Sequence, residues 1–260
     1  RSRGLGDVYK RQILYMVIDI LLAPSHLFEH LYMESILGYD TLNVISLNWA
    51  VLLGIIVGAG FTFFTFSRRK WRYKTMTVIA FSSITGYLMY FYFGIDYALP
   101  KETLFVPLFL RSFGYVIIAI CFLTVLSRVP FQHFFQAVSV QSFVSAGFGG
   151  ALGTAILGHA LNGAMKKNSM LLGSVVDHVN PFISRIPVGE VYGAVQQQAL
   201  MVSMKELYGW LTLMALFCLL AFLVYESDIR PYKVLHPTYR SIRRFVKHEL
   251  RIDKKLEATA

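Results

Sequence analysis

Charged residues are scarce in this sequence. They make up 15% of its 260 residues, whereas soluble domains carry about 25%. So little charge cannot cover a fully hydrated surface, and this excludes most classes of soluble enzyme. Cysteine is also rare. Cys121 and Cys218 both lie in apolar stretches, where a thiol behaves as a small apolar group, so we expect no disulfide framework.

Long apolar runs are what the sequence has in abundance, since 55% of its residues are hydrophobic. A bilayer core of roughly 30 Å needs about 20 residues of helix to cross it. The sequence therefore predicts an all-α membrane protein, a bundle of six transmembrane helices within residues 13–226. The predicted spans are about 13–36, 42–66, 75–95, 103–127, 133–163 and 204–225. The polar residues 1–12 lack an initiator Met and are expected to be a non-native leader.

The net charge of +10 could suggest a nucleic-acid partner, but the positions of the basic residues favour a membrane. Short segments rich in Lys and Arg stay in the cytoplasm. This predicts that the tail at 227–260 lies inside, together with the loop after the second span, and that an outer loop at about 164–203 lies outside. We expect a multi-pass protein of the cell membrane, in bacteria the inner membrane, with the lipid bilayer as partner and no nucleic acid. The basic residues of that cytoplasmic loop are Arg68, Arg69, Lys70, Arg72 and Lys74.

Glycines recur four residues apart in two predicted spans. Gly54 and Gly58 lie in the second span, and Gly149 and Gly153 lie in the fifth. This spacing places a bare backbone stripe on one helix face, where a neighbouring helix can approach closely. The pattern serves a moving helix interface and static packing equally well.

Ionisable and amide side chains inside the predicted spans are the candidates for a transport pathway, because such residues usually face the bundle interior or water. Asp19 and Arg111 lie deepest, at different depths, so they could pair only if the helices tilt or the arginine extends. Arg111 is the better candidate for a functional role. Its charge could act on an anionic group in the pathway or fix the packing of neighbouring helices. Alternatively, its side chain extends so that the guanidinium reaches the outer surface. The full set is Asp19, His26, Glu29, His30, Asn48, Arg111 and Gln141.

Histidines and a glutamate in the first span spell H-x-x-E-H, at His26, Glu29 and His30. In a zinc peptidase this motif binds the metal with two His while Glu serves as base. No clear third ligand follows at a defined spacing, so this interpretation stays an alternative, and an interfacial position is expected for these residues and Glu34. Four tyrosines near the outer end of the third span predict an aromatic belt or a pocket for hydrophobic compounds. They are Tyr87, Tyr90, Tyr92 and Tyr97.

The order of features resembles a known family. A basic loop SRRKWRYK, a helix LFLRSFGYVIIAI, a glycine-rich GFGGALGTAIL and a QQQAL segment before the last span resemble the C-terminal half of a major facilitator superfamily carrier. The likeness is nearest to the fourteen-span drug:proton antiporters and covers about residues 13–226. The basic loop departs from the family motif because it lacks the acidic residue. No coupling residue of the family is carried over, since those lie mainly in the N-terminal half.

The resemblance implies a secondary transporter, not an enzyme, that exports amphipathic compounds against proton entry. Its partners would be the missing N-terminal half of the carrier, a small amphipathic substrate and protons. No cofactor and no metal are expected, and without a G-x-x-x-x-G-K-[ST] loop direct ATP coupling is unsupported. The alternatives are a membrane-embedded zinc metallopeptidase and a membrane scaffold that does not transport.

Overall fold

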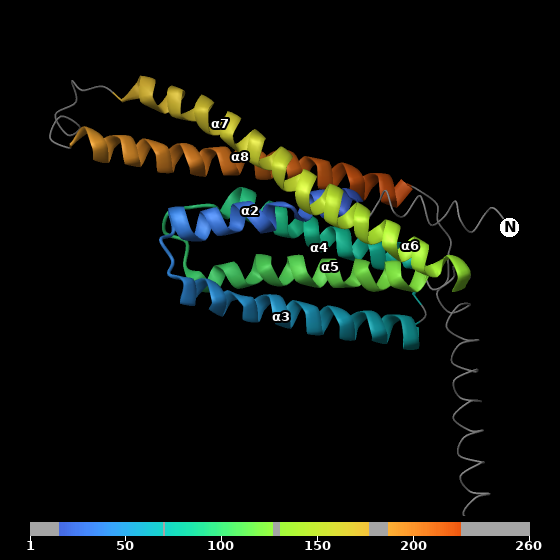
Figure 1. The fold of residues 1–260 in the computed structure, drawn as a ribbon. Coiled ribbons are helices and arrows are strands. Elements are labelled where there is room, and N and C mark those ends of the chain that lie inside the picture. Colours follow the sequence, from blue (N-terminus) through green and yellow to red (C-terminus); the bar gives the residue numbers. More distant parts are fainter. Residues whose placement is uncertain (1–15, 70, 127–130, 177–186, 225–260) are drawn as a thin grey trace, which may run out of the picture.

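A computed structural model describes residues 16–69, 71–126, 131–176 and 187–224 (Figure 1). This part of the chain is helical between its connections and contains no β-strand, so the all-α prediction is confirmed. The predicted leader at 1–12 and basic tail at 227–260 lie outside the described residues.

The first helical segment runs through residues 16–22, turns at Ala23, and continues as α2 (Pro24–Leu31) and a π-helix (Tyr32–Ile36). Pro24 has no backbone N–H, and proline suits the first turn of a helix, where that donor would have no intrahelical partner. The turn is closed by hydrogen bonds from Ala23 N to Ile20 O and from His26 N to Ala23 O. Proline therefore divides this segment without ending it.

The next three helices match the predicted spans to within a few residues. Helix α3 (Thr41–Phe64) starts at Asp40, whose carboxylate accepts a hydrogen bond from Thr41 N at 2.8 Å. A π-helix (Thr65–Arg69) leads to α4 (Tyr73–Gly94). A 3₁₀ turn (Lys101–Leu104) precedes α5 (Phe105–Leu126).

The last two helices are longer than the sequence predicts. Helix α6 (Phe131–Val144) passes through a π-helix (Ser145–Leu152) into α7 (Gly153–Val175), and α8 extends over Val188–Val224. Most of the described residues in the predicted outer connection at 164–203 are therefore helical. Two polar contacts join α7 to α8 in this region. Asn168 donates a hydrogen bond to Ser203, and Lys167 pairs with Glu206 at 3.0 Å.

Five helices in the described part of the chain are long and apolar enough to cross a membrane. The predicted first span at 13–36 is not among them, because the turn at Ala23 divides its described portion into shorter helices. The five helices are compatible with a multi-pass membrane protein. They are Thr41–Phe64, Tyr73–Gly94, Lys101–Thr124, Phe134–Val175 and Val188–Leu223.

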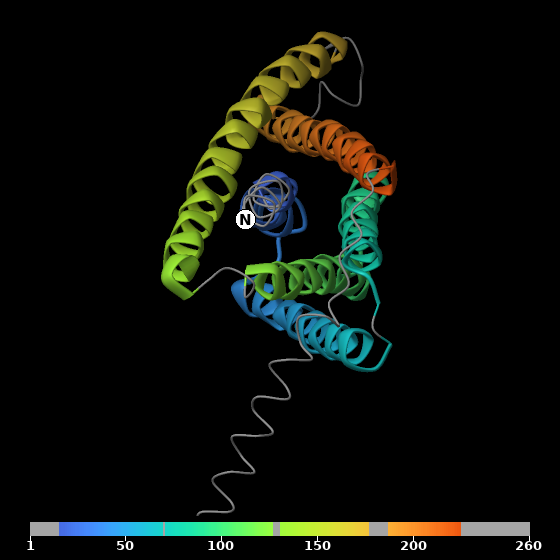
Figure 2. The same cartoon turned by 90° about the vertical axis from the view of Figure 1, so that its right-hand side faces the viewer.

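Successive helices run antiparallel, so the connections gather at two ends (Figure 1). Lys74 Nζ, at the start of α4, donates to Leu223 O at the end of α8 over 2.7 Å. The basic loop and the end of the last helix thus lie at the same end of the bundle, as the predicted alternation requires. Viewed along the helices, the first segment lies in the middle, with α4, α5, α7 and α8 around it and α3 beyond α5 (Figure 2).

Glycines allow three close helix contacts. A Cβ added at Gly54 would lie 2.1 Å from Ser112 Oγ of α5, and one at Gly58 would lie 3.1 Å from Phe113 O. Gly114 of α5 meets the backbone of α4 in the same way, at Ala80 O. The α3 and α5 backbones thus approach as the Gly54 and Gly58 stripe predicts.

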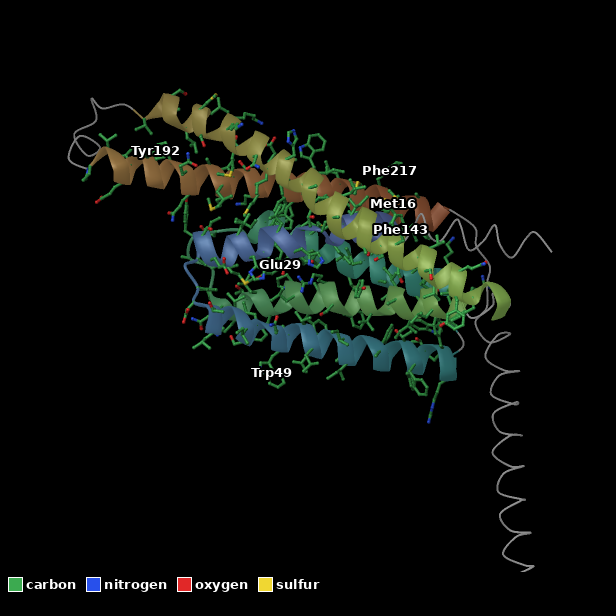
Figure 3. All side chains as sticks on the ribbon, in the orientation of Figure 1. Met16, Glu29, Trp49, Phe143, Tyr192 and Phe217 are labelled. Atoms are coloured by element: carbon green, nitrogen blue, oxygen red, sulfur yellow. The ribbon has the colours of Figure 1, made fainter. Side chains whose placement is uncertain are left out.

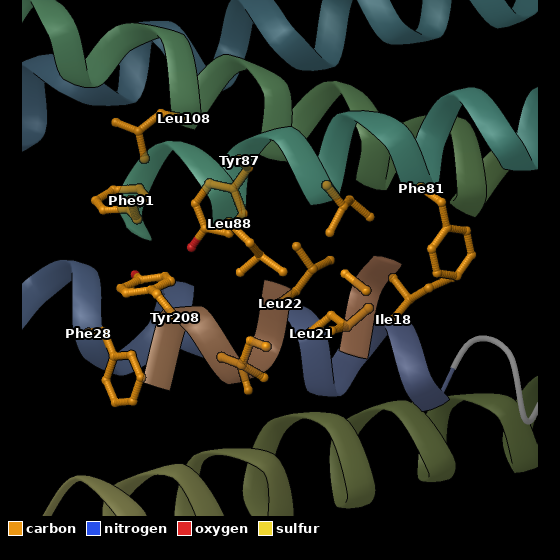
Figure 4. Close-up of a cluster of buried hydrophobic side chains, with 14 of the residues drawn as sticks. Ile18, Leu21, Leu22, Phe28, Phe81, Tyr87, Leu88, Phe91, Leu108 and Tyr208 are labelled. Atoms are coloured by element: carbon orange, nitrogen blue, oxygen red, sulfur yellow. The ribbon is translucent and has the colours of Figure 1, made fainter. Parts of the chain in front are cut away.

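Large apolar side chains cover the outside of the bundle as well as its inside. Trp49, Phe143 and Phe217 point away from the helices (Figure 3) and are each more than 60% exposed. In water such a surface would cause aggregation, whereas in a bilayer it faces lipid. The interior holds a separate core between the first segment, α4 and α8 (Figure 4).

Candidate functional site

Glu29 is the most deeply buried charged side chain of the described residues, at 4% exposure. It lies on α2, just over one turn after Pro24, and points into the bundle (Figure 3). Its Oε1 accepts a hydrogen bond from the Tyr87 hydroxyl of α4 at 2.7 Å. Its Oε2 pairs with Nη1 of Arg111 on α5 at 2.5 Å. We call Glu29, Tyr87 and Arg111 the Glu29 cluster.

The helix patterns explain why these side chains meet. Tyr87 belongs to a face of α4 that also buries Ile84, Leu88 and Phe91, at the three- and four-residue spacing of one helix side. Arg111 is 18% exposed, so its guanidinium reaches the interior instead of snorkelling to the surface. Water does not solvate these charges in the interior, so the carboxylate and the guanidinium neutralise each other. Separating the pair would therefore cost free energy.

An aromatic wall closes one side of the cluster. Tyr208 of α8 is fully buried, stacks on Phe91 with ring centroids 5.1 Å apart, and meets the edge of Phe28 at 5.7 Å (Figure 4). The Tyr208 hydroxyl lies beside the Tyr87 hydroxyl and has no other hydrogen-bond partner among the described residues. Four helical elements, α2, α4, α5 and α8, therefore meet around one carboxylate.

Asp19 lies at the other end of the first segment, about 15 Å of helix rise from Glu29. It contacts the glycine-rich π-helix, where a Cβ added at Gly149 would lie 2.1 Å from Asp19 Cβ. Ser145 hydrogen-bonds its carboxylate, while Oδ2 is buried with no partner in the described part of the chain. Arg111 therefore pairs with Glu29, and the Asp19–Arg111 pair that the sequence left open is not formed. Gly153, the second glycine of this stripe, is buried.

The other predicted site residues are separated from the cluster. His26, His30 and Asn48 are exposed, and His30 lies 3.6 Å from Glu34, which is exposed too. Gln141 of α6 is buried at 7% exposure, away from Glu29. His26, His30 and Glu34 are exposed, so their interfacial position stays a prediction, whereas Glu29 is buried inside the bundle and does not lie at an interface.

The H-x-x-E-H motif does not come together as a zinc site. Glu29 turns inward to Arg111, whereas His26 and His30 are exposed. Within residues 16–69, 71–126, 131–176 and 187–224 no group of three His, Cys, Asp or Glu side chains is placed to hold a metal ion.

The sequence did not predict that Tyr87 bonds a buried carboxylate, nor that Tyr208 lies beside it. The aromatic belt predicted at the end of α4 is wrong for Tyr87, which is fully buried, whereas Tyr92 and Tyr97 are exposed. The signal for Tyr87 was its place on the buried face with Leu88 and Phe91. Tyr208 carried no such signal, because polar residues (Lys205, Glu206 and Thr212) and apolar residues both lie within one turn of it on α8.

Comparison with protein-family models finds no match, and no curated protein matches the sequence. The site is therefore interpreted from its own chemistry. It combines a carboxylate that can bind a proton, a fixed cation and a phenol hydroxyl. The cluster therefore joins α2, α4 and α5 through one carboxylate in the apolar interior.

Proposed function

We propose that this chain is a six-helix half of a secondary transporter that exports amphipathic compounds in exchange for protons. The observation that carries the proposal is the Glu29–Arg111 pair, with Tyr87 as hydrogen-bond donor, in the interior of an apolar bundle. Intramembrane ionisable residues that face a bundle interior commonly mark ion and proton pathways. The resemblance to the C-terminal half of drug:proton antiporters supports the substrate class and the partner half.

In this proposal Glu29 alternates between two states. When ionised it holds α2 to α5 through Arg111 and to α4 through Tyr87. When protonated it leaves Arg111 as an uncompensated buried charge, which is unfavourable in the apolar interior. The guanidinium then seeks water or another acceptor, and the contact between α2 and α5 loosens. Proton binding thereby favours one arrangement of the bundle against its partner half.

The test uses the full-length carrier in proteoliposomes loaded with a fluorescent amphipathic dye. Glu29→Gln keeps the size of the side chain but cannot ionise, so we expect dye exchange without a pH gradient to persist and gradient-driven transport to fall at least tenfold. Glu34→Gln is the matched control, since Glu34 is exposed on the same segment. Full gradient-driven transport by Glu29→Gln would contradict the proposal.

The Arg111→Ala variant provides a second test of the Glu29 cluster. We expect transport to fall while membrane insertion is preserved, because the spans do not depend on this charge. Insertion is followed by protease protection and transport by dye efflux. Unchanged transport would remove Arg111 from the pathway.

A further inference from the structure

A cavity of about 420 Å³, open to the outside of the bundle where Leu123 is exposed, lies between α5, α6 and the π-helix at Ser145–Leu152. Its walls are mostly apolar, with Phe122, Leu123 and Leu126 from α5 and Val138 from α6. This volume falls within the range of small-molecule sites, which are largely apolar with few polar groups. The cavity does not include any residue of the Glu29 cluster.

Three polar residues line this cavity, Gln141, Ser142 and Ser145, and Gln141 is the one with a side-chain amide. Its side chain lines the wall and is 7% exposed, yet neither Oε1 nor Nε2 has a hydrogen-bond partner among the described residues. Buried side-chain amides are nearly always hydrogen-bonded, and the surrounding lipid offers no partner to replace water. An amide acceptor and an amide donor therefore remain open, side by side, beside an apolar space.

We propose that this cavity binds a neutral amphipathic molecule whose head group carries an adjacent donor and acceptor, of the carboxamide class. Such a head forms two antiparallel hydrogen bonds with the Gln141 amide, N–H to Oε1 and C=O from Nε2. The apolar body lies against Phe122, Leu123 and Leu126. A charged head is disfavoured because the described residues lining the cavity include no ionisable side chain.

The test compares two ligands of the same length on the detergent-purified protein, decanamide and methyl decanoate. The ester keeps the carbonyl but lacks the donor, and a site built around a hydrogen bond rejects such an analogue strongly. We expect decanamide to bind roughly tenfold more tightly or better, since losing one hydrogen bond to a buried partner has an effect of this order. Binding is measured by native mass spectrometry over a range of ligand concentrations.

Two variants test whether the ligand binds in the cavity at Gln141. Gln141→Leu is expected to fold at least as stably as the parent, because it removes an unpaired polar group, and to reduce the preference for decanamide to less than about twofold. Gln196→Leu, which changes a glutamine of α8 outside the cavity, should leave the preference intact. Equal binding of the two ligands to the parent protein would overturn the proposal. So would a preference for decanamide that survives in Gln141→Leu.

Discussion

Both carboxylate oxygens of the buried Glu29 have a partner, Tyr87 at Oε1 and Arg111 at Oε2. Arg111→Leu leaves Glu29 buried and unpaired, and breaking a buried pair this way costs about 3–5 kcal/mol. Replacing both residues by leucine removes both charges and should recover most of that loss. We therefore expect Glu29→Leu/Arg111→Leu to unfold at a higher temperature than Arg111→Leu, measured by thermal unfolding in detergent.

The exposed pair of Lys167 and Glu206 serves as the control for this cycle, since its side chains are 58% and 36% exposed. Exposed pairs contribute about 0–1 kcal/mol, so Lys167→Leu should change the unfolding temperature little. A double variant at Glu29 and Arg111 no more stable than Arg111→Leu would show that the two charges are not coupled.

The two buried tyrosines should respond differently to loss of the hydroxyl. Tyr87→Phe removes a hydrogen bond to a charged acceptor, which is worth about 1.5–3 kcal/mol. Tyr208→Phe removes a hydroxyl that faces only the neutral Tyr87 hydroxyl among the described residues, so we expect a smaller loss of stability than for Tyr87→Phe. Chemical or thermal unfolding of the two variants side by side checks this. Equal destabilisation would mean that the Tyr208 hydroxyl is also bonded.

For individual residues, the sequence predicted which charged side chains belong to the site but not which partners they contact. Arg111 and Glu29 stood out because charges are rare in apolar spans. Their pairing depends on the rotation of α2 after Pro24 and on the depth at which α5 crosses it. Neither is encoded in a local pattern, so Asp19 was an equally reasonable partner for Arg111.

Helices α3 and α5 pack through the Gly54 and Gly58 stripe. Gly54→Ala would place a methyl group 2.1 Å from Ser112 Oγ and 2.7 Å from Phe109 O, so the helices must separate, at a cost of about 1–3 kcal/mol. Gly60 has nothing within 4 Å of an added Cβ. Gly60→Ala should therefore leave stability unchanged or raise it through helix propensity.

Thermal unfolding in detergent compares these two glycine variants directly. Because each adds one methyl group to the same helix, any difference between them reports the α3–α5 contact. Similar unfolding temperatures for Gly54→Ala and Gly60→Ala would show that close packing of α3 on α5 is not needed for stability.

Helix positions were well predicted where apolar runs end at polar connections, as for α3, α4 and α5. Helices α7 and α8 extend beyond the predicted spans, which end where Lys166, Lys167 and the glutamines at 196–198 interrupt the apolar residues. These helices continue because they pack on each other beyond the apolar region, where Lys167–Glu206 and Asn168–Ser203 join them. Such pairing between distant segments cannot be read from either segment alone.

The whole molecule is an antiparallel bundle with two unlike ends. The basic loop at Arg68 and Arg69 lies at the end where α8 finishes, and the last turn of α7 and the first turn of α8 lie at the other (Figure 1). Since short segments rich in Lys and Arg stay in the cytoplasm, the start of α8 near Tyr192 should face outward. The proposed transport function depends on this arrangement across the membrane.

Substituted-cysteine labelling of intact cells tests that arrangement most directly. In a background with Cys121→Ala and Cys218→Ala, Tyr192→Cys should react with a membrane-impermeant maleimide added outside. Arg69→Cys should react only after the cells are permeabilised. Labelling of Arg69→Cys in intact cells, or protection of Tyr192→Cys there, would contradict the account.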